Sequence, residues 1–189
     1  MAEIVGFFVD EARSEGLTWT DIGTRLGVSR QAVQKRFIPT ETTRGEFWGR
    51  ATPALRETAE RAHLAAQARR KTYLGTGHLL LGLVGSPEDK ACLALARCGA
   101  APDTVRAAID GQIGVPRGEP LPDETPMTAL ALRCLQHALR ESLRTNSPAI
   151  NNTHLALAVL TVSEGIAHHT LTNLGVNYEA LRAAITPTQ

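Results

Sequence analysis

The chain has 189 residues and a formal net charge of +1 at pH 7, so any nucleic-acid signal must be local rather than global. Hydrophobic residues make up 43% of the sequence, which is enough for a buried core and excludes an intrinsically disordered protein. Alanine, leucine and arginine are plentiful and aromatic residues are scarce, a composition that favours helices.

The apolar runs are short and interrupted, and the first residues carry acids rather than a basic, cleavable start. We therefore expect no membrane span, no secretory signal and a cytoplasmic protein. Cys92, Cys98 and Cys134 are odd in number and show no CxxC spacing, which indicates reduced thiols rather than a disulfide framework.

The first 45 residues are expected to form three short helices. Apolar residues at i+4 spacing predict the first helix over Glu3–Arg13. Thr18, with an acid three residues later, predicts the start of a second helix that ends at Gly27. Ser29 is placed to cap a third helix over Arg30–Phe37. The side chains expected to form the small core are Ile22, Leu26, Val28, Val33 and Phe8 or Phe7.

The segment TDIGTRLGVSRQAVQKRF resembles the helix-turn-helix motif of DNA-binding proteins, although Arg36 stands where that motif has its last apolar residue. The side chains expected to face DNA are Ser29, Arg30, Gln31, Gln34 and Lys35. Arginine and glutamine suit guanine and adenine edges, and serine and lysine suit phosphates. The third helix carries basic residues and no acid, so DNA is the expected partner, bound by a homodimer on paired half-sites. The alternative is a three-helix module that packs on a protein.

The segment Thr40–Arg50 has no clear period and is expected to be a linker that ends in an apolar anchor, Phe47–Trp48. The predicted organisation is thus a helix-turn-helix domain with its linker over residues 1–45 and a second domain over residues 46–189.

The second domain contains an internal repeat at a fixed offset of 76 residues. Leu74–Val84, LGTGHLLLGLV, recurs as Ile150–Leu160, INNTHLALAVL. Arg106–Ile109, RAAI, recurs unchanged as Arg182–Ile185. We infer two copies of one unit, the first over about residues 52–112 and the second over about residues 126–187, joined by a segment rich in glycine and proline.

Each copy is expected to form four helices. In the first copy these cover residues 53–70, 78–84, 88–97 and 102–112, with Thr76 as a cap. In the second they cover residues 126–144, 153–160, 164–174 and 178–185. The predicted fold is all-α: a helix-turn-helix plus a pseudo-twofold, eight-helix domain made of two four-helix repeats.

Tandem copies of a segment such as YLGTGHLLLGLV, each followed by a helix, a glycine turn and a helix like VRAAI, resemble the N-terminal domain of ClpC- and ClpA-type unfoldases. The resemblance covers about residues 46–187. It implies a domain that recruits substrates and adaptors, with components of the Clp protease as possible partners. The chain has no GxxxxGK[ST] motif, so we expect the recruitment domain without its ATPase, no enzyme activity and no cofactor.

One departure from the family pattern concerns ligands. In ClpC-type domains the glutamate of the motif YIGTEHILLGL helps to bind arginine-phosphate marks, but Gly77 and Thr153 stand at those positions here. This implies that phospho-arginine is not bound in the ClpC manner. ClpC-type domains also bind cyclic-peptide antibiotics against apolar residues that correspond to Trp48 and Met127. Ordinary packing is the alternative role for both side chains.

His78 and His154 begin the central helix of each repeat and are expected to be capping or core residues, because no Cys/His/acid set surrounds them to hold a metal. The predicted function is a DNA-binding regulator whose Clp N-like domain binds a peptide or a Clp-targeting cyclic-peptide antibiotic. The alternative is a non-catalytic decoy or adaptor that sequesters ligands or substrates of the Clp protease.

Overall fold

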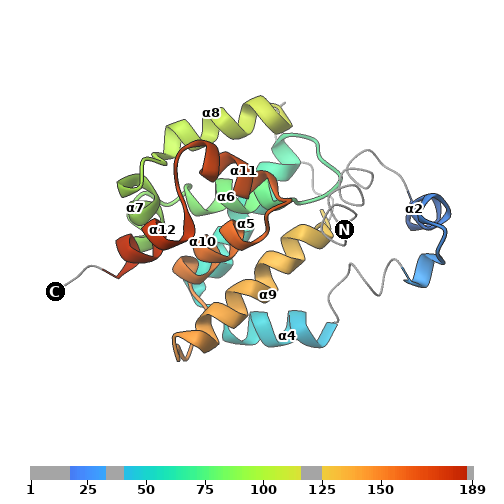
Figure 1. The fold of residues 1–189 in the computed structure, drawn as a ribbon, viewed down its shortest axis with the longest axis horizontal. Coiled ribbons are helices and arrows are strands. Elements are labelled where there is room, and N and C mark those ends of the chain that lie inside the picture. The colour runs from blue at the N-terminus through green and yellow to red at the C-terminus, as the bar shows by residue number, and fades with distance from the viewer. Residues whose placement is uncertain (1–17, 33–40, 116–124, 187–189) are drawn as a thin grey trace.

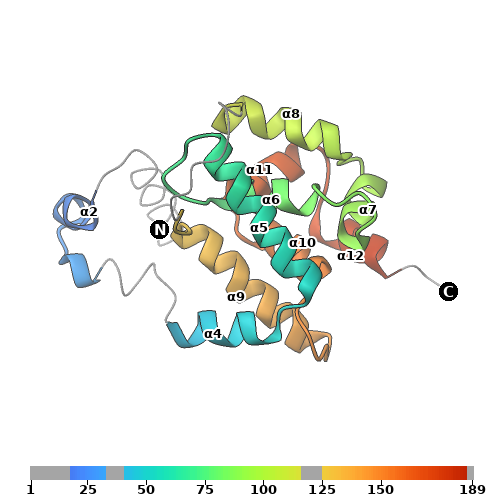
Figure 2. The same cartoon turned by 180° about the vertical axis from the view of Figure 1, so that it is seen from behind.

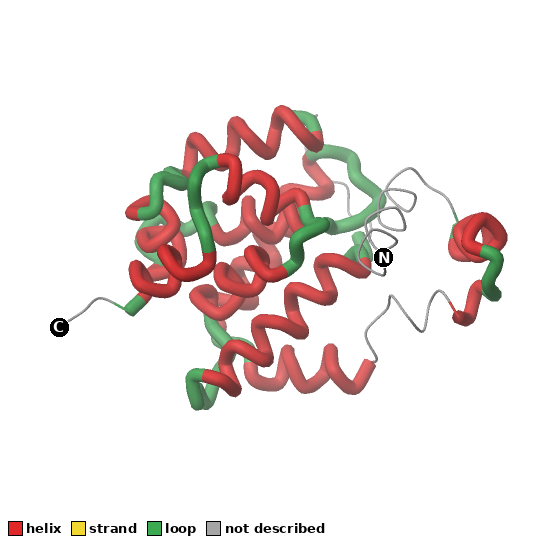
Figure 3. The backbone as a smooth tube through the Cα atoms, viewed as in Figure 1, coloured by secondary structure: helices red, strands yellow, loops and turns green. Residues whose placement is uncertain are grey.

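The computed structural model describes residues 18–32, 41–115 and 125–186, and all regular structure in these ranges is helical (Figures 1 and 3). This confirms the predicted all-α fold. No helix in the same ranges is long and apolar enough to cross a lipid bilayer. The predicted helix at Glu3–Arg13, and the side chains of Gln34 and Lys35, lie outside the described residues.

Helix α2 (Trp19–Leu26) begins and ends as the sequence predicts. The Thr18 backbone N–H donates to the Asp21 carboxylate at 2.8 Å, and the Asp21 N–H donates back to the Thr18 hydroxyl at 3.2 Å. Hydrogen bonds from Thr18 also hold the pKa of Asp21 below its usual value. Gly27 ends the helix at φ 66°, a left-handed conformation that costs glycine no steric clash. The next turn begins at Ser29, whose hydroxyl accepts from the Ala32 N–H at 3.1 Å.

The small core expected around α2 is only partly formed by the described residues. Ile22 is 3% exposed, whereas Leu26 and Val28 are 39% and 48% exposed. The residues expected to cover them, Phe8 and Val33, lie outside the described ranges.

The two repeats supply four helices each, in the predicted order. The first repeat contains α5 (Pro53–Ala68), α6 (Thr76–Leu83), α7 (Lys90–Arg97) and α8 (Pro102–Ile113). The second contains α9 (Ala129–Arg144), α10 (Asn152–Thr161), α11 (Ile166–Asn173) and α12 (Tyr178–Ile185). The ends of most helices differ from the predicted ends by a few residues. Both ends of α12 agree with the prediction.

Helices α6 and α10 lie at the centre of the domain, with the longer helices α8 and α9 on opposite sides of them (Figure 1). Every residue of α6 is buried, from Thr76 to Leu83. A helix surrounded by other helices needs apolar side chains all round, and α6 and α10 are the most apolar of the described helices.

The repeats are linked by an exchange of short backbone segments. Ala51 forms a parallel bridge with Ile150, and Leu74 forms the same bridge with Met127. Ala51 and Met127 are equivalent positions of the two repeats, and so are Leu74 and Ile150. The two bridges are therefore equivalent contacts related by the repeat. In the first, the Thr52 N–H donates to the Ile150 carbonyl at 2.9 Å; in the second, the Thr128 N–H donates to the Leu74 carbonyl at 2.9 Å. The chain therefore has an approximate twofold axis between the repeats.

The linker expected over Thr40–Arg50 is instead helix α4 (Glu41–Arg50), which packs against α9 (Figure 2). Phe47 is 1% exposed and belongs to the hydrophobic core. The Arg50 guanidinium donates to the Ser147 carbonyl at 2.9 Å. The sequence prediction failed because only one short stretch of α4 faces the core, so tertiary packing rather than an apolar period stabilises the helix. The domain boundary predicted between residues 45 and 46 falls inside helix α4. The division into two domains stays a prediction.

Candidate functional site

A pocket of about 560 Å³ lies where the two repeats meet. The first repeat contributes Lys71 and Tyr73 from the loop before α6, and Ile113 from the end of α8. The second contributes Leu130 from the first turn of α9 and Ile166 from the first turn of α11. The pocket is partly open to solvent and mostly apolar. A mostly apolar cleft between structural units is a usual setting for a ligand site.

The packing around residue 77 favours a glycine. Gly77 lines the pocket in the first turn of α6. A Cβ atom there would lie 3.1 Å from Cγ2 of Ile166 and 3.5 Å from Cδ1 of Ile109. Ile166 thus occupies the space next to the position where the ClpC-type motif has its glutamate.

The second repeat also lacks a glutamate at the equivalent position. Thr153 holds the position, and its hydroxyl donates to the Asn151 side-chain oxygen at 2.6 Å. That oxygen also accepts from the Thr153 backbone N–H at 3.0 Å, so the hydroxyl belongs to the cap of α10. Neither repeat presents a carboxylate at the position that resembles the arginine-phosphate site.

One carboxylate, that of Glu164, does line the pocket, and it is already paired. The Arg133 guanidinium donates to its Oε1 at 2.8 Å, and the Ser163 hydroxyl donates to its Oε2 at 3.2 Å. Burial acts to raise the pKa of Glu164, but these hydrogen bonds and the Arg133 charge outweigh it and hold the pKa below its usual value. The group is ionised at neutral pH and its charge is balanced within the protein.

Lys71 is the cation at the pocket. Its side chain is exposed, and no hydrogen bond or ion pair of its ammonium group is found within the described part of the chain. Its neighbour Arg69, by contrast, is buried and pairs with Asp110. The uncompensated charge at the pocket is therefore positive.

His78 and His154 are capping residues of their helices, as the sequence predicts. Nδ1 of each accepts a backbone N–H at 3.1 Å, from Gly75 and Asn151 respectively. This corrects one expectation, because the N-cap of α6 is Gly75 and not Thr76. Within the described residues no group of three or more His, Cys, Asp or Glu side chains could hold a metal ion.

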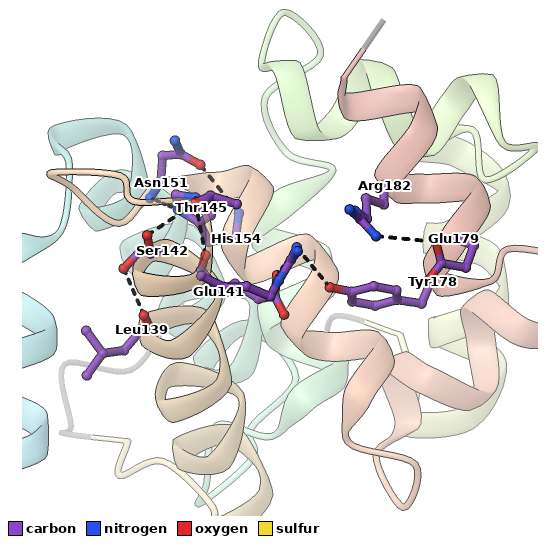
Figure 4. Close-up of polar contacts among 10 residues, drawn as sticks. Leu139, Glu141, Ser142, Thr145, Asn151, His154, Tyr178, Glu179 and Arg182 are labelled. Carbon is purple, nitrogen blue, oxygen red and sulfur yellow. Dashed lines mark hydrogen bonds and ion pairs between the residues drawn. The ribbon is translucent and has the colours of Figure 1, made fainter. Parts of the chain in front are cut away.

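The two histidines differ at Nε2. Nε2 of His154 lies 3.2 Å from the Thr145 hydroxyl at the end of α9 (Figure 4). Nε2 of His78 is buried without a hydrogen-bond partner. Burial, then the charges of Arg69 and Lys71, lower the pKa of His78 to about 3.

The structure places Trp48 and Met127 in separate packing environments. Trp48 packs edge-on against Phe47, with ring centroids 4.9 Å apart, and the Arg56 guanidinium lies 6.0 Å from the Trp48 ring centroid. Met127 bridges to Leu74 through its backbone. Both side chains are partly buried against the core, and neither lines the pocket.

Of the side chains expected to face DNA, the structure describes Ser29, Arg30 and Gln31, and all three are exposed. Gln34 and Lys35 lie outside the described residues.

Sequence reasoning missed most of the pocket. No motif or spacing in the sequence assigns a ligand-binding role to Lys71, Glu164 or Ile166. All three lie in loops or first turns next to the two central helices. The repeat register locates these loops, but it does not show that loops from different repeats meet.

Comparison with known proteins agrees with the fold. The family model described as Clp repeat (R) N-terminal domain matches residues 50–151 and 126–188. An uncharacterised protein of Mycobacterium tuberculosis is 34% identical over 166 residues, which are 86% of this chain and 65% of that relative. The chain thus spans just under two thirds of the length of this relative.

Two further matches involve Clp proteins. The negative regulator of genetic competence ClpC/MecB of Bacillus subtilis is 26% identical over 139 residues, 74% of this chain and 17% of ClpC/MecB. The solved complex of the ClpV N-domain with a VipB peptide superposes with a TM-score of 0.60 at 21% identity, covering 74% of this chain and 89% of that one. The double repeat, its pseudo-twofold exchange and the family match together show that the chain belongs to the Clp repeat N-terminal domain family.

Proposed function

We propose that this protein is a DNA-binding regulator whose Clp repeat domain binds a peptide in the pocket between the repeats. The observation that carries the peptide-binding part of the proposal is the pocket itself, with its mostly apolar lining and with Lys71, for which the described residues offer no ion-pair partner. The structurally similar ClpV N-domain was solved in complex with a VipB peptide, which supports a peptide as the kind of ligand.

The DNA-binding part of the proposal rests on the segment that starts at Thr18. Three features of this segment support a helix-turn-helix: its capped helix, its left-handed turn at Gly27 and the new helical turn capped by Ser29. Arg30 and Gln31 are exposed in the first turn after Ser29, where recognition helices carry their base-reading side chains. A single module neutralises few phosphates, so we propose that a homodimer binds paired half-sites.

The regulatory link would run through α4. This helix follows the proposed DNA-binding segment in the sequence, and it packs into the core of the Clp repeat domain, where Phe47 is buried. A ligand changes DNA affinity only if it binds the DNA-competent and the DNA-free states with different affinities. We propose that a peptide or a Clp-targeting cyclic peptide has this preference. For the cyclic peptide, the proposed contacts are Trp48 and Met127, which lie outside the pocket lining.

The second candidate function is that of an adaptor or decoy that holds Clp ligands or substrates away from the unfoldase, with components of the Clp protease as partners. It is favoured by the extent of the family match, which covers the chain from residue 50 to residue 188. This function needs the pocket but does not need Arg30.

The test is a salt-titrated gel shift of the full-length protein on the DNA upstream of its own gene, with and without a Clp-targeting cyclic peptide. We expect a specific complex that the peptide releases. Arg30→Ala should weaken specific binding about tenfold or more, because a guanidinium on a guanine edge contributes about 1–3 kcal/mol of discrimination. Arg140→Ala, on the exposed side of α9, is the matched control.

Specific binding that ignores the peptide would contradict ligand regulation and leave a DNA-binding protein. Absence of any DNA binding at low salt would refute the regulator, and the adaptor or decoy would then be the better function.

A further inference from the structure

We propose that the pocket between the repeats selects peptide segments that place a carboxylate beside an apolar side chain, and that it discriminates against a guanidinium in the same place. This inference rests on the proposed peptide-binding function and names the ligand class of that site.

The apolar half of the preference comes from the pocket's walls. Tyr73 and Ile113 from the first repeat and Leu130 and Ile166 from the second line a space of about 560 Å³. Filling such a space with a leucine- or phenylalanine-sized side chain removes apolar surface from water on both partners, at about 25 cal/mol per Å². No charge in these four side chains has to be desolvated.

The exclusion of a guanidinium follows from the state of the acids. A buried guanidinium needs an opposing carboxylate, because an unpaired charge in a mostly apolar pocket is costly. Position 77 is a glycine packed against Ile166, and Glu164 is already paired with Arg133 at 2.8 Å. The Glu164 side chain is only 8% exposed, so it is not available to a second cation.

The preference for a carboxylate follows from Lys71. Its ammonium group is exposed at the pocket and has no ion-pair partner within the described ranges, so a ligand carboxylate can approach it without breaking an existing pair. Helix α9 also begins at the pocket with Thr128 as its cap, and the partial positive charge of a helix N-terminus adds to the same field. The pair would be partly exposed, so its contribution to affinity is modest and falls with added salt.

The experiment measures fluorescence anisotropy with full-length protein and four labelled peptides. All share one apolar sequence and differ at a single residue next to a central leucine: Asp, Asn, Arg or phospho-arginine. The Asp peptide is expected to bind about threefold to fivefold more tightly than the Asn peptide, the size of an exposed ion pair. The Arg peptide should bind most weakly, and the Asp advantage should shrink between 50 and 500 mM salt.

Lys71→Glu is the decisive variant, since an exposed side chain can be changed without unfolding the protein. It should reverse the order, so that the Arg peptide binds more tightly than the Asp peptide. Arg140→Glu makes the same change in net charge on an exposed part of α9 outside the pocket lining and should leave the order unchanged.

Equal binding of all four peptides, an order that Lys71→Glu does not alter, or tightest binding of the phospho-arginine peptide would each overturn this inference while leaving peptide binding itself intact. Failure of every peptide to bind would instead remove the proposed peptide-binding function.

Discussion

The hydroxyl of Thr76, in the first turn of α6, accepts a hydrogen bond from the Ala167 backbone N–H in α11 at 3.3 Å. The N-cap of α11 is Gly165, which has no side chain to offer. The equivalent contact on the opposite side of the pseudo-twofold axis is different, because there Asn152 of the second repeat donates to the side chain of Asp89, the N-cap of α7, at 2.8 Å. Each repeat thus contacts a helix start in the other, but only Thr76 accepts a backbone N–H.

Thr76→Val should therefore destabilise the protein by about 1–2 kcal/mol, because it keeps the shape of the side chain but leaves a buried N–H unpaired. Urea unfolding followed by circular dichroism measures the change. Thr76→Ser keeps the acceptor and should lose less. In a Thr76→Ala background, Gly165→Ser supplies a cap from within α11 and should recover part of the loss. If Thr76→Val is as stable as the unmodified protein, the hydroxyl does not cap α11.

Gly82→Ala should destabilise the crossing of α5 and α6. A Cβ atom at Gly82 would lie 2.3 Å from the Thr58 carbonyl oxygen and 3.1 Å from the Ala62 nitrogen, so the helices would have to move apart. We expect a loss of about 2–3 kcal/mol in the free energy of unfolding, typical of overpacking. The second repeat carries Ala158 at the equivalent position, so this close approach is specific to the first repeat.

Gly111→Ala is the matched control for that change. No atom lies within 4 Å of a Cβ built at Gly111, which is in α8. Alanine is the better helix former by about 0.5–1 kcal/mol, so this variant should be slightly more stable. Equal effects of the two substitutions would show that helix packing does not distinguish the sites.

His78 should make the protein less stable as the pH falls below about 6.5. Its folded pKa is about 3, so the folded state keeps the imidazole neutral while the unfolded state takes up a proton near pH 6.5. The unfolded state then binds more protons, and stability falls with decreasing pH by up to about 1.4 kcal/mol per unit between these two pKa values.

His78→Gln should flatten this slope by a similar amount between about pH 6 and pH 4, in unfolding measured at a series of pH values. Burial also lowers the pKa of His154, so a weaker slope of the same sign should remain. Above about pH 7.5 both proteins should show the same dependence on pH, since histidine is neutral in both states. Parallel curves below pH 6 would contradict the burial of a neutral His78.

Phe47→Ala should cost about 3–4 kcal/mol if α4 belongs to the domain core, because the side chain is 1% exposed. Trp48→Ala should cost less, since Trp48 is only partly buried. Chemical denaturation of the two variants gives the comparison. A small effect of Phe47→Ala would show that α4 is an attached linker after all.

The elements that the sequence predicted well are those whose signals are local. The box formed by Thr18 and Asp21 marks the start of α2, and the cap at Asn177 and apolar period of α12 give that helix its predicted ends. Helix α4 was missed because its one strong anchor, Phe47, becomes informative only when α9 lies beside it. The role of Thr76 was misassigned for the same reason, since its partner Ala167 is 91 residues away.

The sequence by itself determined the all-α class, the double repeat and the absence of a carboxylate at positions 77 and 153, because each of these depends only on residue types and their spacing. Only the tertiary structure decided that loops from both repeats meet to form one pocket and that Ile166 lies against Gly77. It also decided that Arg133 neutralises Glu164, while Lys71 has no ion-pair partner in the described part of the chain. The physical reason is that packing and charge balance depend on which distant side chains become neighbours, and the pseudo-twofold exchange of backbone segments brings them together.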